Sequence, residues 1–256
     1  MTHKDIYTKF MIEYDKANVT SSYPSLTEYE VATILDKAYN ALIAQKVTGN
    51  NVRRASFEAD VKSISDLQSL VTTSSILSLS PSTLISNVKS TNLPSQFLYF
   101  VSAQVGYIQG VQPIVLRDVQ NVKLVNHDIA QKFFQTNHNK PWVKEPVAFI
   151  EDGKFKVVYD PMVFIGGDSQ NPSQSPINSA YITFIKKPNK FVKTSNDNIS
   201  GYNGCFDWTG SMPTEYNFEL NDTMAEELIN LAITFALENV ESQRLNTKLN
   251  TRGLEA

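Results

Sequence analysis

The feature that most constrains the fold is a long apolar segment near the C-terminus, residues 221–243. Asn221 or Asp222 can accept hydrogen bonds from the free N–H groups of a first helical turn. Apolar residues then recur at helical spacing in two adjacent rows: Met224, Leu228, Leu231 and Phe235, and Ala225, Ile229, Ala232, Ala236 and Val240. Two rows make a face too broad for a surface helix. We therefore predict a helix covered on more than one side, by other parts of the chain or by another subunit.

Three N-terminal segments offer apolar faces that could cover this helix. Residues 3–16 predict a short amphipathic helix. The next helix is expected to begin at Thr27, since Thr27 and Glu30 have the spacing of a capping box, and to end at Gly49. A third helix, about residues 57–70, is expected to present one apolar side made of Phe57, Val61, Ile64, Leu67 and Val71. The simplest topology brings helices from both chain ends into one bundle.

The middle of the chain has the composition and alternation of β-structure. Candidate strands are residues 76–79, 97–107, 113–125 and 180–185, with a short helix at 129–135. Asp152-Gly153 joins two alternating runs and predicts a hairpin turn with positive φ. We therefore predict an α+β protein: a helical bundle from residues 1–71 and 217–256, with a C-terminal docking tail, and an inserted β-rich lobe of residues 72–216 with long loops.

Composition excludes several classes of protein. The net charge of −3 argues against an exposed, sequence-independent nucleic-acid binder, because phosphate neutralisation needs a surplus of Lys and Arg. A single cysteine excludes an intrachain disulfide and leaves too few thiols for a zinc site. No apolar run reaches the roughly 18 residues of a membrane span, and the start has no signal-peptide pattern. We expect a protein made in the cytoplasm and not embedded in a membrane.

No catalytic, cofactor or metal site emerges from the sequence. None of the histidines lies at metal-ligand spacing with another histidine or with the cysteine: His3, His127 and His138. His127 and Asp128 are adjacent at a helix start, where neighbouring side chains seldom face each other and Asp128 fits a cap better. Glu226 and Glu227 also diverge as neighbours on a helix, and the helix dipole accounts for both. We predict that the protein is not an enzyme and takes no cofactor.

Two surface clusters have more than one reading. The first is basic and could touch phosphate or form a solvated loop: Lys46, Arg53 and Arg54. The second is aromatic and could stack on sugars, fill a pocket of a neighbouring subunit or fold over its own loop: Tyr202, Phe206 and Trp208. In the tail, residues 241–256, Leu245 and Leu249 are four residues apart, which suits a short helix docked on a partner. A frayed terminus is the alternative.

Three pieces of the chain resemble structural proteins of tailed bacteriophages. Residues 6–51, from IYTKFMIEYD to QKVTGNN, look like the opening of a structural protein of crAss-like phages of gut Bacteroides-group bacteria. The second piece is residues 124–161, LVNHDIAQKFF to KVVYDP. The third pairs SAYITFIKKPNKF with the helix ELNDTMAEELINLAITFALENVESQRL, an arrangement similar to the C-terminal region of head-to-tail connector proteins.

The resemblance implies a ring-forming adaptor of the portal vertex. Such adaptors dock under the portal protein in twelve-fold symmetry, contact the next tail ring or tube protein, and let genomic DNA pass without binding it specifically. The protein would then reside in the neck or tail of the virion. Its C-terminal tail would dock on the portal through two apolar anchors and three basic side chains: Leu245, Leu249, Arg244, Lys248 and Arg252.

One other class of function remains open at this point, and a third is disfavoured. A tail-displayed β-rich module would bind a host-surface glycan or receptor through the aromatic cluster. An enzyme such as a cell-wall hydrolase would need paired acids or a metal site, and the sequence offers neither pattern.

Overall fold

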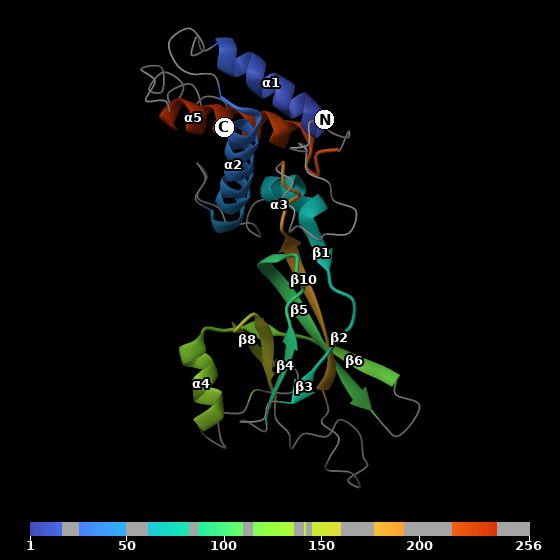
Figure 1. Ribbon diagram of the computed structural model, residues 1–256. Coiled ribbons are helices and arrows are strands. Elements are labelled where there is room, and N and C mark those ends of the chain that lie inside the picture. Colours follow the sequence, from blue (N-terminus) through green and yellow to red (C-terminus); the bar gives the residue numbers. More distant parts are fainter. Residues whose placement is uncertain are drawn as a thin grey trace. The chain divides into compact units, whose positions relative to one another are not determined.

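The protein consists of two compact units (Figure 1). The computed structural model describes residues 1–16, 26–49, 61–81, 87–109, 115–135, 141, 145–159, 177–191 and 217–239. One unit, here called the helical unit, comprises Met1–Leu70 and Lys187–Ala256, and the other, the β unit, comprises Val71–Lys186. The described residues form helices together with antiparallel and mixed sheets, so the predicted combination of both element types is confirmed.

The helical unit is organised around its last helix. Its helices are α1 (His3–Lys16), α2 (Glu28–Thr48), α3 (Val61–Leu67) with the 3₁₀ turn η2 (Gln68–Leu70), and α5 (Asp222–Asn239). Helix α5 packs against both α1 and α2, and α2 also contacts α3. In α5 the buried apolar side chains belong to both predicted rows and widen them: Met224, Ala225, Leu228, Ile229, Leu231, Ala232, Ile233, Ala236 and Leu237. The prediction that this helix is covered on more than one side is confirmed.

Helix α2 begins and ends as its sequence predicts. The Thr27 hydroxyl accepts from the Glu30 N–H at 3.3 Å, and the Glu30 carboxylate accepts from the Thr27 N–H at 2.7 Å. These two bonds form a complete capping box, which satisfies donors that the first helical turn leaves open. At the other end Gly49 adopts φ 74°, the left-handed conformation that terminates a helix and that glycine adopts without steric cost.

Helix α3 buries a different face from the one predicted. Val61 is 81% exposed and Ile64 is 40% exposed. The buried residues of α3 and η2 are instead Ser63, Asp66, Leu67 and Leu70. The prediction of one apolar side that includes Val61 and Ile64 is therefore wrong, because polar groups on the inner face have specific partners, described below.

The β unit contains two sheets. The first has the order β1 (Val71–Thr73), β10 (Ile177–Lys186), β5 (Phe97–Gln109), β6 (Val115–Asn121), and β2 (Leu77–Ser78) also pairs with β10, all antiparallel. The second has the order β3 (Ser80–Pro81), β4 (Val88–Asn92), β9 (Lys154–Val158), β8 (Val147–Glu151), β7 (Lys123–Leu124), with β7 and β8 parallel. The long strands β5 and β10 include the predicted segments. Strands β1, β3 and β4 are not among the predicted strands.

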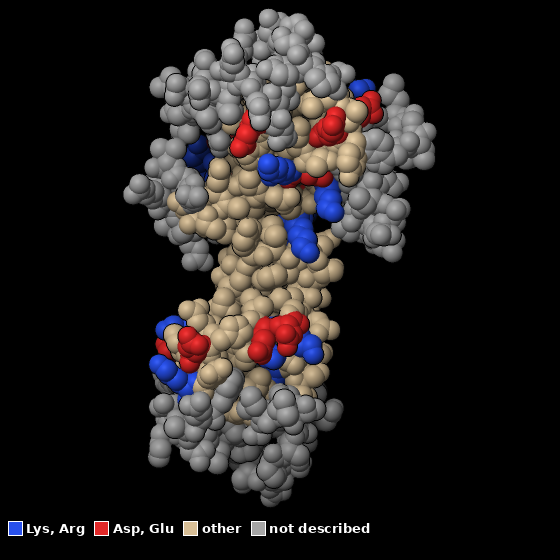
Figure 2. Space-filling model, turned by 60° about the vertical axis from the view of Figure 1, so that its left-hand side comes forward, with Lys and Arg blue, Asp and Glu red and all other residues tan. Residues whose placement is uncertain are grey.

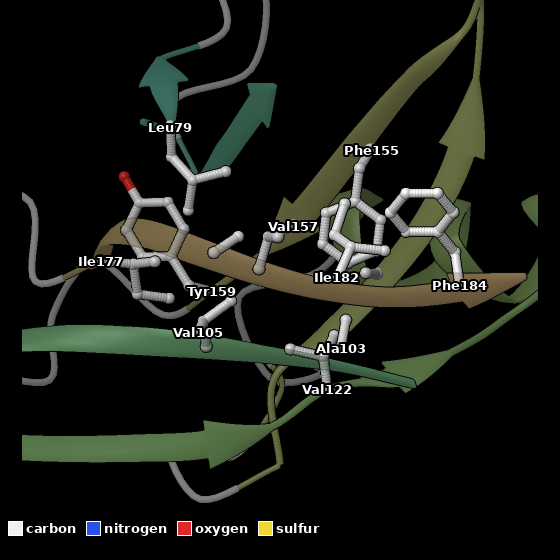
Figure 3. Close-up of a cluster of buried hydrophobic side chains, with 12 residues drawn as sticks. Leu79, Ala103, Val105, Val122, Phe155, Val157, Tyr159, Ile177, Ile182 and Phe184 are labelled. Carbon is white, nitrogen blue, oxygen red and sulfur yellow. The ribbon is translucent and has the colours of Figure 1, made fainter. Parts of the chain in front are cut away.

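The core of the β unit lies between the inner faces of its two sheets. Alternate residues of β5 and β10 meet those of β8 and β9, as Figure 3 shows for Val105, Ile182, Phe155 and Val157. Burial on one face produces the period-two pattern that identified these strands in the sequence. On the other face of the second sheet, helix α4 (His127–Gln135) packs through Ala130.

The predicted hairpin is present in the second sheet. Strands β8 and β9 pair in antiparallel register from Val147 opposite Val158 to Glu151 opposite Lys154. The two turn residues, Asp152 and Gly153, have φ of 54° and 67°. Two successive positive φ values match the right-handed twist of the strands that they connect. The Asp-Gly prediction is confirmed.

Replacement of Thr27 by alanine is expected to lower the free energy of unfolding by about 1 kcal/mol, because it removes the capping hydroxyl of α2. Chemical denaturation of the full chain followed by circular dichroism measures this loss. Thr33→Ala is the matched control, since Thr33 is exposed within α2 and alanine has the higher helix propensity. Equal losses in the two variants would contradict a capping role for Thr27.

Candidate assembly site

A cluster of charged groups, here called the ionic junction, joins three helices of the helical unit. The Nζ atom of Lys46 in α2 lies 3.0 Å from Oδ2 of Asp66 in α3 and 3.0 Å from Oε2 of Glu227 in α5. The amide of Asn221 donates to Oδ1 of Asp66 at 3.3 Å. Lys62 lies 3.7 Å from Oε1 of Glu227 at the edge of the junction. One lysine therefore links the carboxylates of two different helices.

Burial makes these contacts energetically important. The side chains of Lys46 and Asp66 are 12% and 7% exposed, so neither is well solvated. Burial alone would lower the pKa of Lys46, but its bonds to Glu227 and Asp66 outweigh that effect and raise the pKa above its ordinary value. The stability contributed by Lys46 is thus fully present below about pH 10.5 and is lost only as the pH rises through the higher folded-state pKa.

The ionic junction explains which face of α3 points outward. Asp66 must face α2 and α5 to reach Lys46, and helical periodicity then turns Ser63 and Leu67 inward with it. Val61 and Ile64, three residues apart, consequently lie together on the exposed side. Val61 and Ile64 thus form an exposed apolar pair on α3, and ion pairs help to hold α3 in the helical unit.

In the sequence, Lys46 lies near Arg53 and Arg54 in a basic cluster expected to touch phosphate or to form a solvated loop. The structure contradicts this for Lys46, whose side chain is only 12% exposed and is paired in the ionic junction with two carboxylates from distant parts of the chain. Arg53 and Arg54 lie outside the described residues. One feature of the sequence indicates that Asp66 needs a cationic partner. It lies on a predicted helix next to apolar Leu67, and an unpaired carboxylate is disfavoured on a buried face.

The paired glutamates of α5 diverge, as their adjacent positions predict. Glu226 pairs with Lys9 of α1, whereas Glu227 pairs with Lys46. The helix dipole was expected to account for both residues, but each of them also joins α5 to another helix. The two carboxylates therefore act in packing, on separate sides of the helix.

The histidine and acid at the start of α4 also have different surroundings. The ring of His127 packs edge-on against Phe149, with 5.7 Å between ring centroids. Asp128 lies in the first turn, where the helix dipole favours negative charge. The carbonyl of Asn126 accepts from the N–H groups of Ile129 and Ala130, so Asn126 and not Asp128 is at the cap position, and the helix starts at His127, two residues earlier than predicted.

Other residues singled out from the sequence lie outside the described residues. These are His138, the aromatic cluster and the proposed portal-docking side chains: Tyr202, Phe206, Trp208, Arg244, Leu245, Lys248, Leu249 and Arg252.

The described surface carries charges of both signs and several exposed apolar side chains. On the face drawn in Figure 2, acidic and basic side chains are interspersed within each unit. The exposed large apolar residues are Ile12, Tyr29, Val61 and Ile64 in the helical unit and Ile76, Val119, Leu124 and Ile129 in the β unit. Val61 is the most exposed of them. Such side chains, when adjacent, are typical of contact surfaces.

Within the described ranges, no group of three or more His, Cys, Asp or Glu side chains is placed to hold a metal ion. No helix in the same part of the chain is long and apolar enough to cross a membrane. Comparison of the sequence with protein-family models and with curated proteins gives no match.

Replacement of Lys46 by methionine is expected to cost about 3–5 kcal/mol of unfolding free energy, because it leaves the Asp66 carboxylate buried without its cation. Lys62→Met is the matched control, since its side chain is 45% exposed and its contact with Glu227 is longer. We expect a loss of less than about 1 kcal/mol for that variant. Urea denaturation at pH 7 measures both, and equal small losses would show that the ionic junction contributes little.

Proposed function

We propose that this chain is a virion structural protein, a ring-forming head-to-tail adaptor that docks on the portal protein and extends the DNA channel toward the tail. The observation that carries the proposal is the resemblance of three separate pieces of the sequence, which lie between residues 6 and 245, to structural proteins of crAss-like phages and to connector proteins. Partners would be further copies of the chain, the portal protein and the next tail ring or tube protein.

The surface of the helical unit supports the proposal physically. In a ring, each subunit contacts its neighbour through two different surfaces, and the contact needs apolar area that the folded subunit leaves open. Val61 and Ile64 provide such area on α3. The ionic junction fixes the orientation of α3 through Asp66, so the apolar pair is held in place by the subunit before any partner arrives.

We further propose that different parts of the chain have different roles in the assembly. The helices from the two chain ends form a bundle that carries the ring, with about twelve copies, and the β-rich lobe inserted between them faces the next ring or the exterior. Residues 241–256 dock on the portal, with Leu245 and Leu249 as apolar anchors. Arg244, Lys248 and Arg252 meet acidic groups of the partner. A mildly acidic protein suits a channel wall along which DNA slides, because it does not hold phosphate tightly.

Two variants separate ring formation from portal docking. Val61→Ser/Ile64→Ser removes the exposed apolar pair and is expected to prevent ring closure, whereas a chain ending at Gln243 keeps the ring but loses attachment to portal. Native mass spectrometry with purified portal protein measures both outcomes. Ile12→Ser is the control, since Ile12 is an exposed apolar residue on α1. Circular dichroism of each variant verifies that the fold is retained.

Several results would contradict the proposal. If the unaltered chain forms no ring, alone or on portal, the adaptor role fails. If the ring forms normally in Val61→Ser/Ile64→Ser, the contact surface is elsewhere. If the chain instead binds glycans from the host surface and does not bind portal protein, the result supports the receptor-binding alternative.

A further inference from the structure

His3 occupies a position in the helical unit that would suit an apolar aromatic residue. The residue is 1% exposed, and its ring stacks on Phe191 with 4.3 Å between centroids and 25° between planes. Phe218 lies tilted against it at 6.3 Å. Tyr39 of α2 contacts both phenylalanine rings, at 6.4 Å and 5.0 Å. The start of α1 therefore contacts the rest of the unit through an imidazole in an aromatic cluster, next to the Met1–Asp222 ion pair and the backbone hydrogen bond from the Phe218 N–H to the Met1 carbonyl.

The imidazole has polar atoms that this environment does not satisfy. Among the described residues, neither Nδ1 nor Nε2 of His3 has a hydrogen-bond partner. A buried polar atom without a partner costs free energy, and a buried charge costs far more. Burial accordingly lowers the pKa of His3 from 6.5 to about 4, since it disfavours the imidazolium. The packed arrangement is thus specific for the neutral ring.

The charged groups of the surrounding elements have other contacts. In α1, the Asp5 carboxylate accepts from the Thr2 N–H at 2.9 Å. The Asp36 carboxylate of α2 accepts from the Phe191 N–H at 2.6 Å, and the Glu219 carboxylate accepts from the Asn189 N–H at 2.8 Å. Other titratable groups within a few residues of these contacts are Lys4, Tyr7, Lys37, Tyr39, Lys187 and Lys190, and the Met1 ammonium pairs with Asp222 at 2.7 Å. Burial lowers the pKa of His3.

We infer that His3 is an acid-sensitive latch, whose neutral ring holds helix α1 in the helical unit and whose protonation releases the helix. The closed state excludes the proton, whereas an opened α1 exposes the ring to water. Between the folded-state pKa of about 4 and the ordinary value of 6.5, only the opened state binds the proton, so acidification in this window favours opening. Below about pH 4 both states are protonated and no further effect arises from His3. The inference does not depend on the proposed assembly.

Hydrogen exchange of the full chain tests the latch. After correction for intrinsic exchange rates, we expect protection of α1 amides to fall on the order of 100-fold more between pH 7 and pH 4.5 than protection of the middle of α2. His3→Phe keeps the aromatic contact and removes the titrating group, so its α1 protection is expected to be independent of pH in this window. His127→Gln, which removes a histidine from α4 in the β unit, is expected to behave as the unaltered chain does.

Two results would overturn the inference. One is the same pH-dependent loss of α1 protection in His3→Phe as in the unaltered chain, and the other is a loss shared equally by α1 and α2. If His3→Phe does not fold, nuclear magnetic resonance titration of the unaltered protein decides the matter. A His3 midpoint well below 6.5 supports the latch, and a midpoint at or above 6.5 contradicts it.

Discussion

The helical unit depends on the burial of α5. Large apolar side chains such as Leu228, Ile229 and Leu231 are removed from water almost completely, and each contributes about 1.5–3 kcal/mol to stability. Because α1 and α2 supply the covering surfaces, the two ends of the chain must fold together. Neither α1 nor α2 alone could bury a face that extends around most of the helix. The other contacts of the helical unit surround this packing of α5 against α1 and α2.

Polar groups within the unit determine how the other helices are oriented. Lys46 pairs with acids from two helices, and this fixes the rotation of α3, which hydrophobic burial alone would not do. His3 has the opposite character, since its nitrogens have no partner among the described residues and its ring is retained only while neutral. The first contact stabilises one orientation across the neutral pH range. The second makes the attachment of α1 sensitive to acid.

Features with local causes were predictable from the sequence. The capping box at Thr27, the positive-φ turn at Asp152 and Gly153, and the broad apolar face of α5 each arise within a few residues or a few helical turns. The exposed face of α3 was not predictable in the same way. It depends on Asp66 meeting Lys46 and Asn221, the latter 155 residues away along the chain. The helical spacing of apolar residues predicts that Val61 is buried. That spacing contains no information on ion pairs with residues far away in the sequence.

Strands with unusual composition were missed for a similar reason. Strand β4 carries Lys89, which is buried and donates to the carbonyl of Ile177 in β10. A lysine inside a short polar run does not suggest a strand, and its acceptor becomes apparent only when the two sheets are placed. For the candidate site, the apolar character of Val61 and Ile64 was evident in the sequence. That they are exposed was not, because the exposure follows from the ionic junction.

The proposed ring would match the portal, with one copy of this chain for each portal subunit. The most direct test of this proposal is the number of copies of this chain relative to portal protein in purified virions, determined by quantitative mass spectrometry. We expect a ratio near one to one. A ratio far from one, or absence of the chain from virions, would contradict it.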